Sequence, residues 1–138
     1  MWKLYTDGAA RGNPGHAGAG AVLLDAGGEQ VATLAEYLGK LTNNEAEYAA
    51  LLKGLELART HGATELLVHM DSELVVRQLL GRYKVKAEHL RPTYEKALKE
   101  LKTFKTWSVV HVRREQNGIA DELANQGVDQ GPGKGAGA

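Results

Sequence analysis

Four carboxylates stand in four separated segments of the chain: Asp7 in YTDG, Glu47 in TNNEAEY, Asp71 in VHMDSE and Asp121 in NGIADELAN. Acids next to apolar strands, or on the buried sides of helices, are unfavourable unless a cation neutralises them. Ligand sets made only of oxygen are typical of Mg²⁺ or Mn²⁺ rather than Zn²⁺. If the fold brings these acids together, they form a site for divalent cations.

Each acid taken alone also has an ordinary structural explanation. Asp71 can cap the helix predicted to follow it, and Asp7 can belong to a turn with Gly8. Glu47 and Asp121 can be first-turn acids that the helix dipole stabilises. The combination is the stronger argument, because all four are expected to converge at one edge of a sheet.

Helical geometry separates two of these acids from their neighbours. At 3.6 residues per turn, Glu47 lies roughly 200° around the helix from Glu45, on the apolar side. By the same reasoning Asp121 lies at the edge of an apolar stripe that includes Ile119, whereas Glu122 points away. In each pair the inward acid is the candidate ligand.

The elements that must position these acids predict one α/β domain. Strands are predicted over residues 2–7, 18–26, 29–38, 65–70 and 107–112, and helices over 42–60, 72–80, 92–102 and from 117 to 127 or 129. Tight connections make the first three strands antiparallel, and the later helical crossovers make the last two parallel. We therefore expect a mixed five-stranded sheet with helices on both faces. The domain is predicted over residues 1–130, and the Gly-rich segment 131–138 is predicted to be a disordered tail.

Composition excludes several classes of protein. The 138 residues include 17 basic and 17 acidic residues and no cysteine. A disulfide framework and a thiolate metal site are therefore excluded. No apolar run approaches the roughly 18 residues of a membrane span, and the N-terminal segment does not resemble a signal peptide. We expect a soluble, cytoplasmic protein without a membrane partner.

The motifs around the acids resemble those of type 1 ribonuclease H. They are TDGAARGNPG, TNNEAEY, MDSE and REQNGIADELAN, in this order, and the match extends from about Trp2 to Gly127. The resemblance implies a ribonuclease H-like fold and hydrolysis of the RNA strand of RNA–DNA hybrids, giving 5′-phosphate and 3′-hydroxyl ends. It also implies that the four acids hold two Mg²⁺ ions, or Mn²⁺ in their place, with Asp7 bridging the two.

The resemblance further implies two sets of substrate contacts. Positions that read the minor groove, where 2′-hydroxyls distinguish RNA from DNA, are matched by Asn13, Asn43 and Asn44. Positions that grip a phosphate of the DNA strand are matched by Lys40, Thr42 and Asn117. Without the motif, Asn43 and Asn44 are typical helix-capping residues and the GNPG segment is a plain turn.

Two features depart from the family pattern. Well-known bacterial members insert a basic helix, a handle that holds the hybrid, where this chain has only residues 81–90. From Arg82 to Lys105 there are eight Lys or Arg residues against three Glu, which form either a phosphate-contacting strip or a solvated helix face. A histidine common in the loop before the last helix is also missing. We expect Arg113 or Arg114 to take over part of its role by contacting phosphate.

The remaining candidates and alternatives are few. His69 and His111 are predicted to be packed residues rather than catalytic ones. The leading interpretation is a monomeric, handle-less ribonuclease HI that acts on RNA–DNA hybrids. The alternative is a catalytically weak duplex-binding domain of the same fold. Loss of an acid would favour that alternative, and none of the four is lost.

Overall fold

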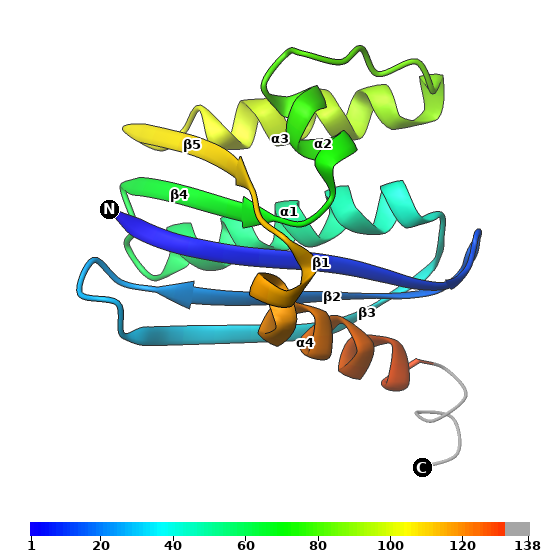
Figure 1. The fold of residues 1–138 in the computed structure, drawn as a ribbon, viewed down its shortest axis with the longest axis horizontal. Coiled ribbons are helices and arrows are strands. Elements are labelled where there is room, and N and C mark those ends of the chain that lie inside the picture. The colour runs from blue at the N-terminus through cyan, green and yellow to red at the C-terminus, as the bar shows by residue number, and fades with distance from the viewer. Residues whose placement is uncertain (132–138) are drawn as a thin grey trace.

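A mixed five-stranded sheet forms the centre of the computed structural model, in the order β3-β2-β1-β4-β5 (Figure 1). The structure describes residues 1–131. The strands are β1 (Trp2–Gly12), β2 (Gly15–Leu24), β3 (Gln30–Leu41), β4 (Glu65–Met70) and β5 (Thr106–His111). β1 to β3 pair antiparallel, whereas β4 is parallel to both β1 and β5. The predicted fold class is confirmed.

Helices cover both faces of this sheet (Figure 1). They are α1 (Asn43–Thr60), α2 (Glu73–Leu79), α3 (Arg91–Leu101) and α4 (Gly118–Asp129), with short 3₁₀ turns η1 (Glu88–Leu90) and η2 (Arg114–Asn117). α1, α2 and α3 share one hydrophobic core with the sheet, which includes Leu4, Leu51, Val68, Val75 and Leu101. α4 packs on the opposite face, across β1, β2 and β3.

The first hairpin is longer than the sequence predicts. β1 continues to Gly12 and β2 already begins at Gly15, because the two strands stay paired up to that turn. Asp7 therefore lies inside a strand, and the predicted turn at Gly8 is wrong. The pairing of β1 with β4, however, ends at Tyr5. Beyond Tyr5, β4 no longer covers this edge of β1, and the start of α1 packs there instead. Asp7 lies on this stretch of β1.

Small residues in β2 allow α4 to approach the sheet closely. A Cβ atom on Gly18 or Gly20 would lie only 2.2 or 2.1 Å from main-chain oxygens of Ala124 and Ala120. The glycines that break the apolar alternation in this segment are therefore contact points for a helix. This contact sets the position of the α4 residues relative to β1.

The predicted domain boundary, residue 130, lies at the C-terminal cap of α4. Gly131, just after this cap, is buried, and its N–H donates to the Val128 carbonyl in the last turn of α4 at 2.9 Å. The rest of the predicted disordered tail, residues 132–138, lies outside the described residues. Within residues 1–131, none of the helices combines the length and the apolar character needed to cross a bilayer.

Candidate metal centre

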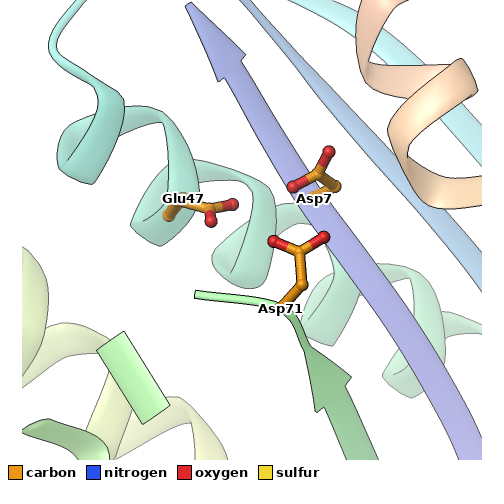
Figure 2. Close-up of side chains that lie close together, drawn as sticks. All are labelled: Asp7, Glu47 and Asp71. Carbon is orange, nitrogen blue, oxygen red and sulfur yellow. The ribbon is translucent and has the colours of Figure 1, made fainter. Parts of the chain in front are cut away.

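Three of the four predicted acids meet at one point of the fold. One carboxylate oxygen from each of Asp7, Glu47 and Asp71 lies within 4.8 Å of one from each of the others. Figure 2 shows their side chains pointing toward one another from β1, α1 and the segment after β4. We call these three residues the acid cluster. Carboxylate oxygens at this spacing fit a hard divalent cation such as Mg²⁺.

The Glu47 carboxylate is positioned by a close contact between α1 and β1. Its Oε1 accepts a hydrogen bond from the Gly8 N–H at 2.6 Å. A Cβ atom at Gly8 would lie 2.2 Å from the main chain of Ala46, so only glycine permits this approach. The start of α1 is held by the predicted capping box, in which Thr42 and Glu45 bond each other's main-chain N–H.

The Asp71 carboxylate does not cap the helix that follows it. Ser72 is the N-cap of α2, and its hydroxyl accepts from the Val75 N–H at 3.4 Å. The ordinary explanation for Asp71 is therefore wrong. Its Oδ2 instead accepts a hydrogen bond from Asn117 Nδ2 at 3.0 Å. This bond ties the end of β4 to the start of α4.

Asp121 lies in the first turn of α4, beside Asp7. It is half-buried, whereas Glu122 is exposed, as the helical geometry predicts. The predicted apolar stripe needs a correction, because Ile119 is 59% exposed. The buried face of α4 consists of Ala120, Ala124, Gly127 and Val128. These small residues fit against the sheet, whereas the larger Ile119 side chain, one position before Ala120, faces solvent.

Electrostatics show that the acid cluster resists full ionisation. Burial, followed by the charges of Glu47 and Asp71, raises the pKa of Asp7 to about 9. A side-chain hydrogen bond with Asp121 adds to this shift. Burial also raises the pKa of Glu47 to about 7, although the Gly8 N–H and the charge of Arg114 act in the opposite direction. Carboxylates in this state are what a bound cation neutralises.

Comparison with known proteins identifies the family. A family model described as reverse transcriptase-like matches residues 5–127. The ribonuclease HI of Halobacterium salinarum is 42% identical over 125 residues, which are 91% of this chain and 63% of that protein. A ribonuclease H of Thiobacillus denitrificans is 33% identical over 141 residues, covering 92% of this chain and 93% of that protein. The chain belongs to the ribonuclease H family.

A solved structure of a ribonuclease H supports the same assignment. The crystal structure of LC11-RNase H1 in complex with an RNA/DNA hybrid matches with a TM-score of 0.88 and 41% identity, over 94% of this chain and 98% of that one. The chain spans less than two thirds of the length of the Halobacterium relative. The ribonuclease H fold predicted from the sequence is confirmed.

Five of the predicted substrate contacts of the ribonuclease H motif gather around the start of α1. Asn13 Oδ1 accepts from the Asn43 N–H at 3.0 Å, which holds the GNPG turn against the helix. Lys40 is exposed near the end of β3, and Thr42 caps α1. Asn44 is half-buried and lies one helical turn before Glu47 in α1. Thr42, rather than either asparagine after it, supplies the cap, so the capping explanation for Asn43 and Asn44 is wrong.

Asn117 does not fit its predicted contact with a phosphate. Its side chain is only 1% exposed, and both of its donated hydrogen bonds go to protein oxygens. The sequence gives no sign of this burial, because asparagine before a helix is typical of an exposed cap.

Gly8 is a second functional position that sequence reasoning underrated. A glycine inside a strand is itself a signal of close backbone approach.

The histidine and arginine candidates separate in the structure. His69 is buried against Tyr5, with ring centroids 4.1 Å apart, and its Nδ1 lies 3.3 Å from the Leu4 carbonyl oxygen, which confirms a packed role. His111 is exposed, so the packing predicted for it is wrong. Arg113 and Arg114 are both exposed, and the positive charge of Arg114 partly offsets the raised pKa of Glu47.

Proposed function

We propose that this chain is an endoribonuclease that hydrolyses the RNA strand of RNA–DNA hybrids at the acid cluster. The observation that carries the proposal is the convergence of Asp7, Glu47 and Asp71 within 4.8 Å, with Asp121 beside Asp7. All four motif acids of the family are therefore present. A ribonuclease H structure 41% identical to this chain is a complex with an RNA/DNA hybrid, which supports the substrate class.

The acids would hold two Mg²⁺ ions, or Mn²⁺ in their place. The bound ions would activate a water molecule and stabilise the leaving oxygen of an in-line phosphoryl displacement. The protein's own part is to orient the carboxylates. The Gly8 N–H orients Glu47, the Asn117 amide orients Asp71, and the first turn of α4 presents Asp121.

Amide groups near the acid cluster are suited to telling RNA from DNA. An asparagine side chain can both donate to and accept from a 2′-hydroxyl. Asn13, Asn43 and Asn44 lie within one turn of α1 or bond directly to it. Lys40 and Thr42 at the same helix start are placed to contact a phosphate, and the positive charge of Arg114 acts on Glu47. These contacts would set the strand preference of the site.

A groove beside Asn44 supplies a surface for the duplex where the handle is missing. It lies between the start of α1, α2 and the segment after α2, and it is lined by Asn44, Leu74, Gln78, Arg82, Tyr83, Lys84, Lys86 and Ala87. The buried Val85 anchors this segment while its basic neighbours stay exposed. Phosphates attract such a row of cations, and an exposed aromatic ring adds apolar contact.

The α3 part of the predicted basic strip has different surroundings. Lys96 lines a separate groove that also contains Glu56, Arg59 and Glu100. Mixed charge of this kind is typical of a solvated helix face. We therefore assign the phosphate-contacting strip to Arg82, Lys84 and Lys86. The monomeric state and the cytoplasmic location stay predictions from the sequence.

The direct test is cleavage of an end-labelled RNA–DNA hybrid with Mg²⁺ or Mn²⁺ and with EDTA. We expect the parent to cut the RNA strand only with metal, leaving 5′-phosphate and 3′-hydroxyl ends. Asp7→Asn is expected to abolish cleavage while hybrid binding is retained, because it removes a ligand charge but little volume. Glu122→Gln, an exposed neighbour in α4, is the matched control. Hybrid binding by the parent without cleavage in either metal would establish the duplex-binding alternative.

A further inference from the structure

Asn117 connects the segments that carry three of the four acids. It lies where η2 meets α4, and its side chain is buried. Its Nδ2 donates to the Thr6 carbonyl at 2.9 Å and to Asp71 Oδ2 at 3.0 Å. Thr6 precedes Asp7 in β1, and Asn117 itself lies one helical turn before Asp121. One amide group therefore joins β1, the end of β4 and the start of α4.

The two acceptors determine which way the amide faces. A carbonyl oxygen and a carboxylate oxygen both need a donor, so the NH₂ group must point toward them. Both of its hydrogens are then used. A hydrogen bond to a charged acceptor is also stronger than one between neutral groups. The contact with Asp71 is therefore a strong, directional restraint on that carboxylate.

The other end of the same side chain shows which of its atoms do the work. Within the described residues, Asn117 Oδ1 is buried without a hydrogen-bond partner, and so is the Thr6 hydroxyl. Leaving a buried acceptor unpaired costs about 1–3 kcal/mol. An apolar side chain of similar size would avoid that cost. The benefit of asparagine must therefore come from the two bonds that it donates.

We propose that Asn117 is a positioning residue that sets the Asp71 carboxylate, and with it the start of α4, in the geometry needed to bind the catalytic cations. The inference rests on the proposed metal-dependent function. Three mutually repelling carboxylates tend to turn away from one another. The Asn117 amide holds one of them by a single oxygen, Oδ2, and leaves Oδ1 outside that bond. Partners that orient a ligand in this way strengthen metal binding without contacting the metal.

The test compares Asn117→Leu with the parent and with Asn125→Leu. Leucine is close in size and removes both donated bonds and the unpaired oxygen. Asn125 lies in the same helix and donates to the Asp121 main-chain oxygen at 3.0 Å rather than to a carboxylate, so it is the matched control. Mg²⁺ affinity of the substrate-free proteins is measured by titration calorimetry. We expect Asn117→Leu to weaken Mg²⁺ binding by roughly 10- to 100-fold, and Asn125→Leu to leave it unchanged.

Steady-state kinetics and thermal unfolding separate positioning from stability. We expect Asn117→Leu to lower kcat and to raise the Mg²⁺ concentration needed for half-maximal rate, while KM for the hybrid stays close to that of the parent. The variant should still unfold cooperatively, at a lower temperature because the Thr6 carbonyl loses its donor. A folded Asn117→Leu variant with parental Mg²⁺ affinity would overturn the proposal. Weakened Mg²⁺ binding in a chain that never cleaves hybrids would support Asn117 as a positioning residue and contradict only the proposed function.

A measurement on the parent keeps the proposal testable if the leucine variant does not fold. The Asn117 side-chain amide protons are followed by NMR during addition of Mg²⁺. Because they bond to a carboxylate that is a proposed ligand, we expect them to exchange slowly and to shift as Mg²⁺ binds. Signals that exchange rapidly, or that stay in place while Mg²⁺ saturates the protein, contradict the proposal.

Discussion

Replacing Asp7 with asparagine is expected to stabilise the metal-free protein at neutral pH. In the folded chain, burial and then the charges of Glu47 and Asp71 raise the pKa of the Asp7 carboxyl from 3.8 to about 9. Between about pH 4 and pH 9 the Asp7 carboxyl therefore keeps its proton in the folded protein, whereas in the unfolded chain it has already lost it. Stability of the parent must fall as the pH rises through this window.

The size of the effect follows from that shift. Each pH unit above 3.8 lowers the free energy of unfolding by about 1.4 kcal/mol, because the folded state must keep a proton that the unfolded chain gives up. At pH 7 the Asp7 carboxyl therefore lowers the free energy of unfolding by about 4 kcal/mol, compared with a side chain that does not ionise. Asparagine keeps nearly the same volume and needs no proton, although its buried amide still loses some hydration. We expect Asp7→Asn to gain about 2–4 kcal/mol at pH 7, which corresponds to a rise of roughly 10 °C in Tm.

Urea unfolding followed by circular dichroism measures this gain, in EDTA, at pH 5.5 and pH 8 and at constant ionic strength. The variant should be more stable than the parent at both pH values, and the difference should be larger at pH 8. Adding Mg²⁺ should stabilise the parent, by about 2.7 kcal/mol at one hundred times its Kd, and the variant less.

A matched control separates burial from net charge. Glu122→Gln also removes one negative charge, but from an exposed side chain in α4, so it should change the free energy of unfolding little. If Asp7→Asn is no more stable than the parent in EDTA at pH 8, burial and like charges do not make ionisation of Asp7 as costly as its raised pKa implies. Equal stability of the parent at pH 5.5 and pH 8 would refute the same reasoning.

Three further sets of substitutions test the surroundings of the site. Gly8→Ala should lower the free energy of unfolding by about 1–3 kcal/mol and abolish cleavage, because its Cβ would lie 2.2 Å from the main chain of α1; thermal unfolding and the cleavage assay check this. The double change Lys84→Ala and Lys86→Ala should raise KM for the hybrid at unchanged kcat. It should also make the slope of log K for hybrid binding against log salt concentration shallower by roughly one to two. Arg114→Ala should lower kcat more than Arg113→Ala, because the charge of Arg114 acts on the acid cluster.

Each of these has its own control or contrary outcome. Gly118→Ala adds a methyl group where no neighbouring atom lies within 4 Å, so it should be tolerated. Changing Lys96 and Lys99 to alanine removes the same charge from α3 and should leave KM unchanged. If the α3 pair has the larger effect, the duplex runs over the other groove. Parental turnover in both arginine variants would remove the idea that either replaces the missing histidine.

The sequence by itself determined what depends on neighbouring residues along the chain. The capping box of Thr42 and Glu45 and the inward direction of Glu47 follow from helical geometry alone, and the structure confirms them. The motifs around the acids were specific enough to indicate the ribonuclease H family. These features were accessible because each depends on residues within one or two turns, or on a contiguous signature.

Tertiary structure alone decided which of these residues meet. Asp7 reaches Asp71 because β1 pairs with β4, whose sequence lies some sixty residues away, and that pairing stops at Tyr5. Ile119 is exposed and Asn117 buried because packing of α4 onto the glycines of β2 sets the rotation of that helix. Periodicity predicts which side of an element is apolar, but it does not say what lies against that side. Asn117, which the resemblance assigned to a phosphate contact, is therefore a buried link between three segments of the site.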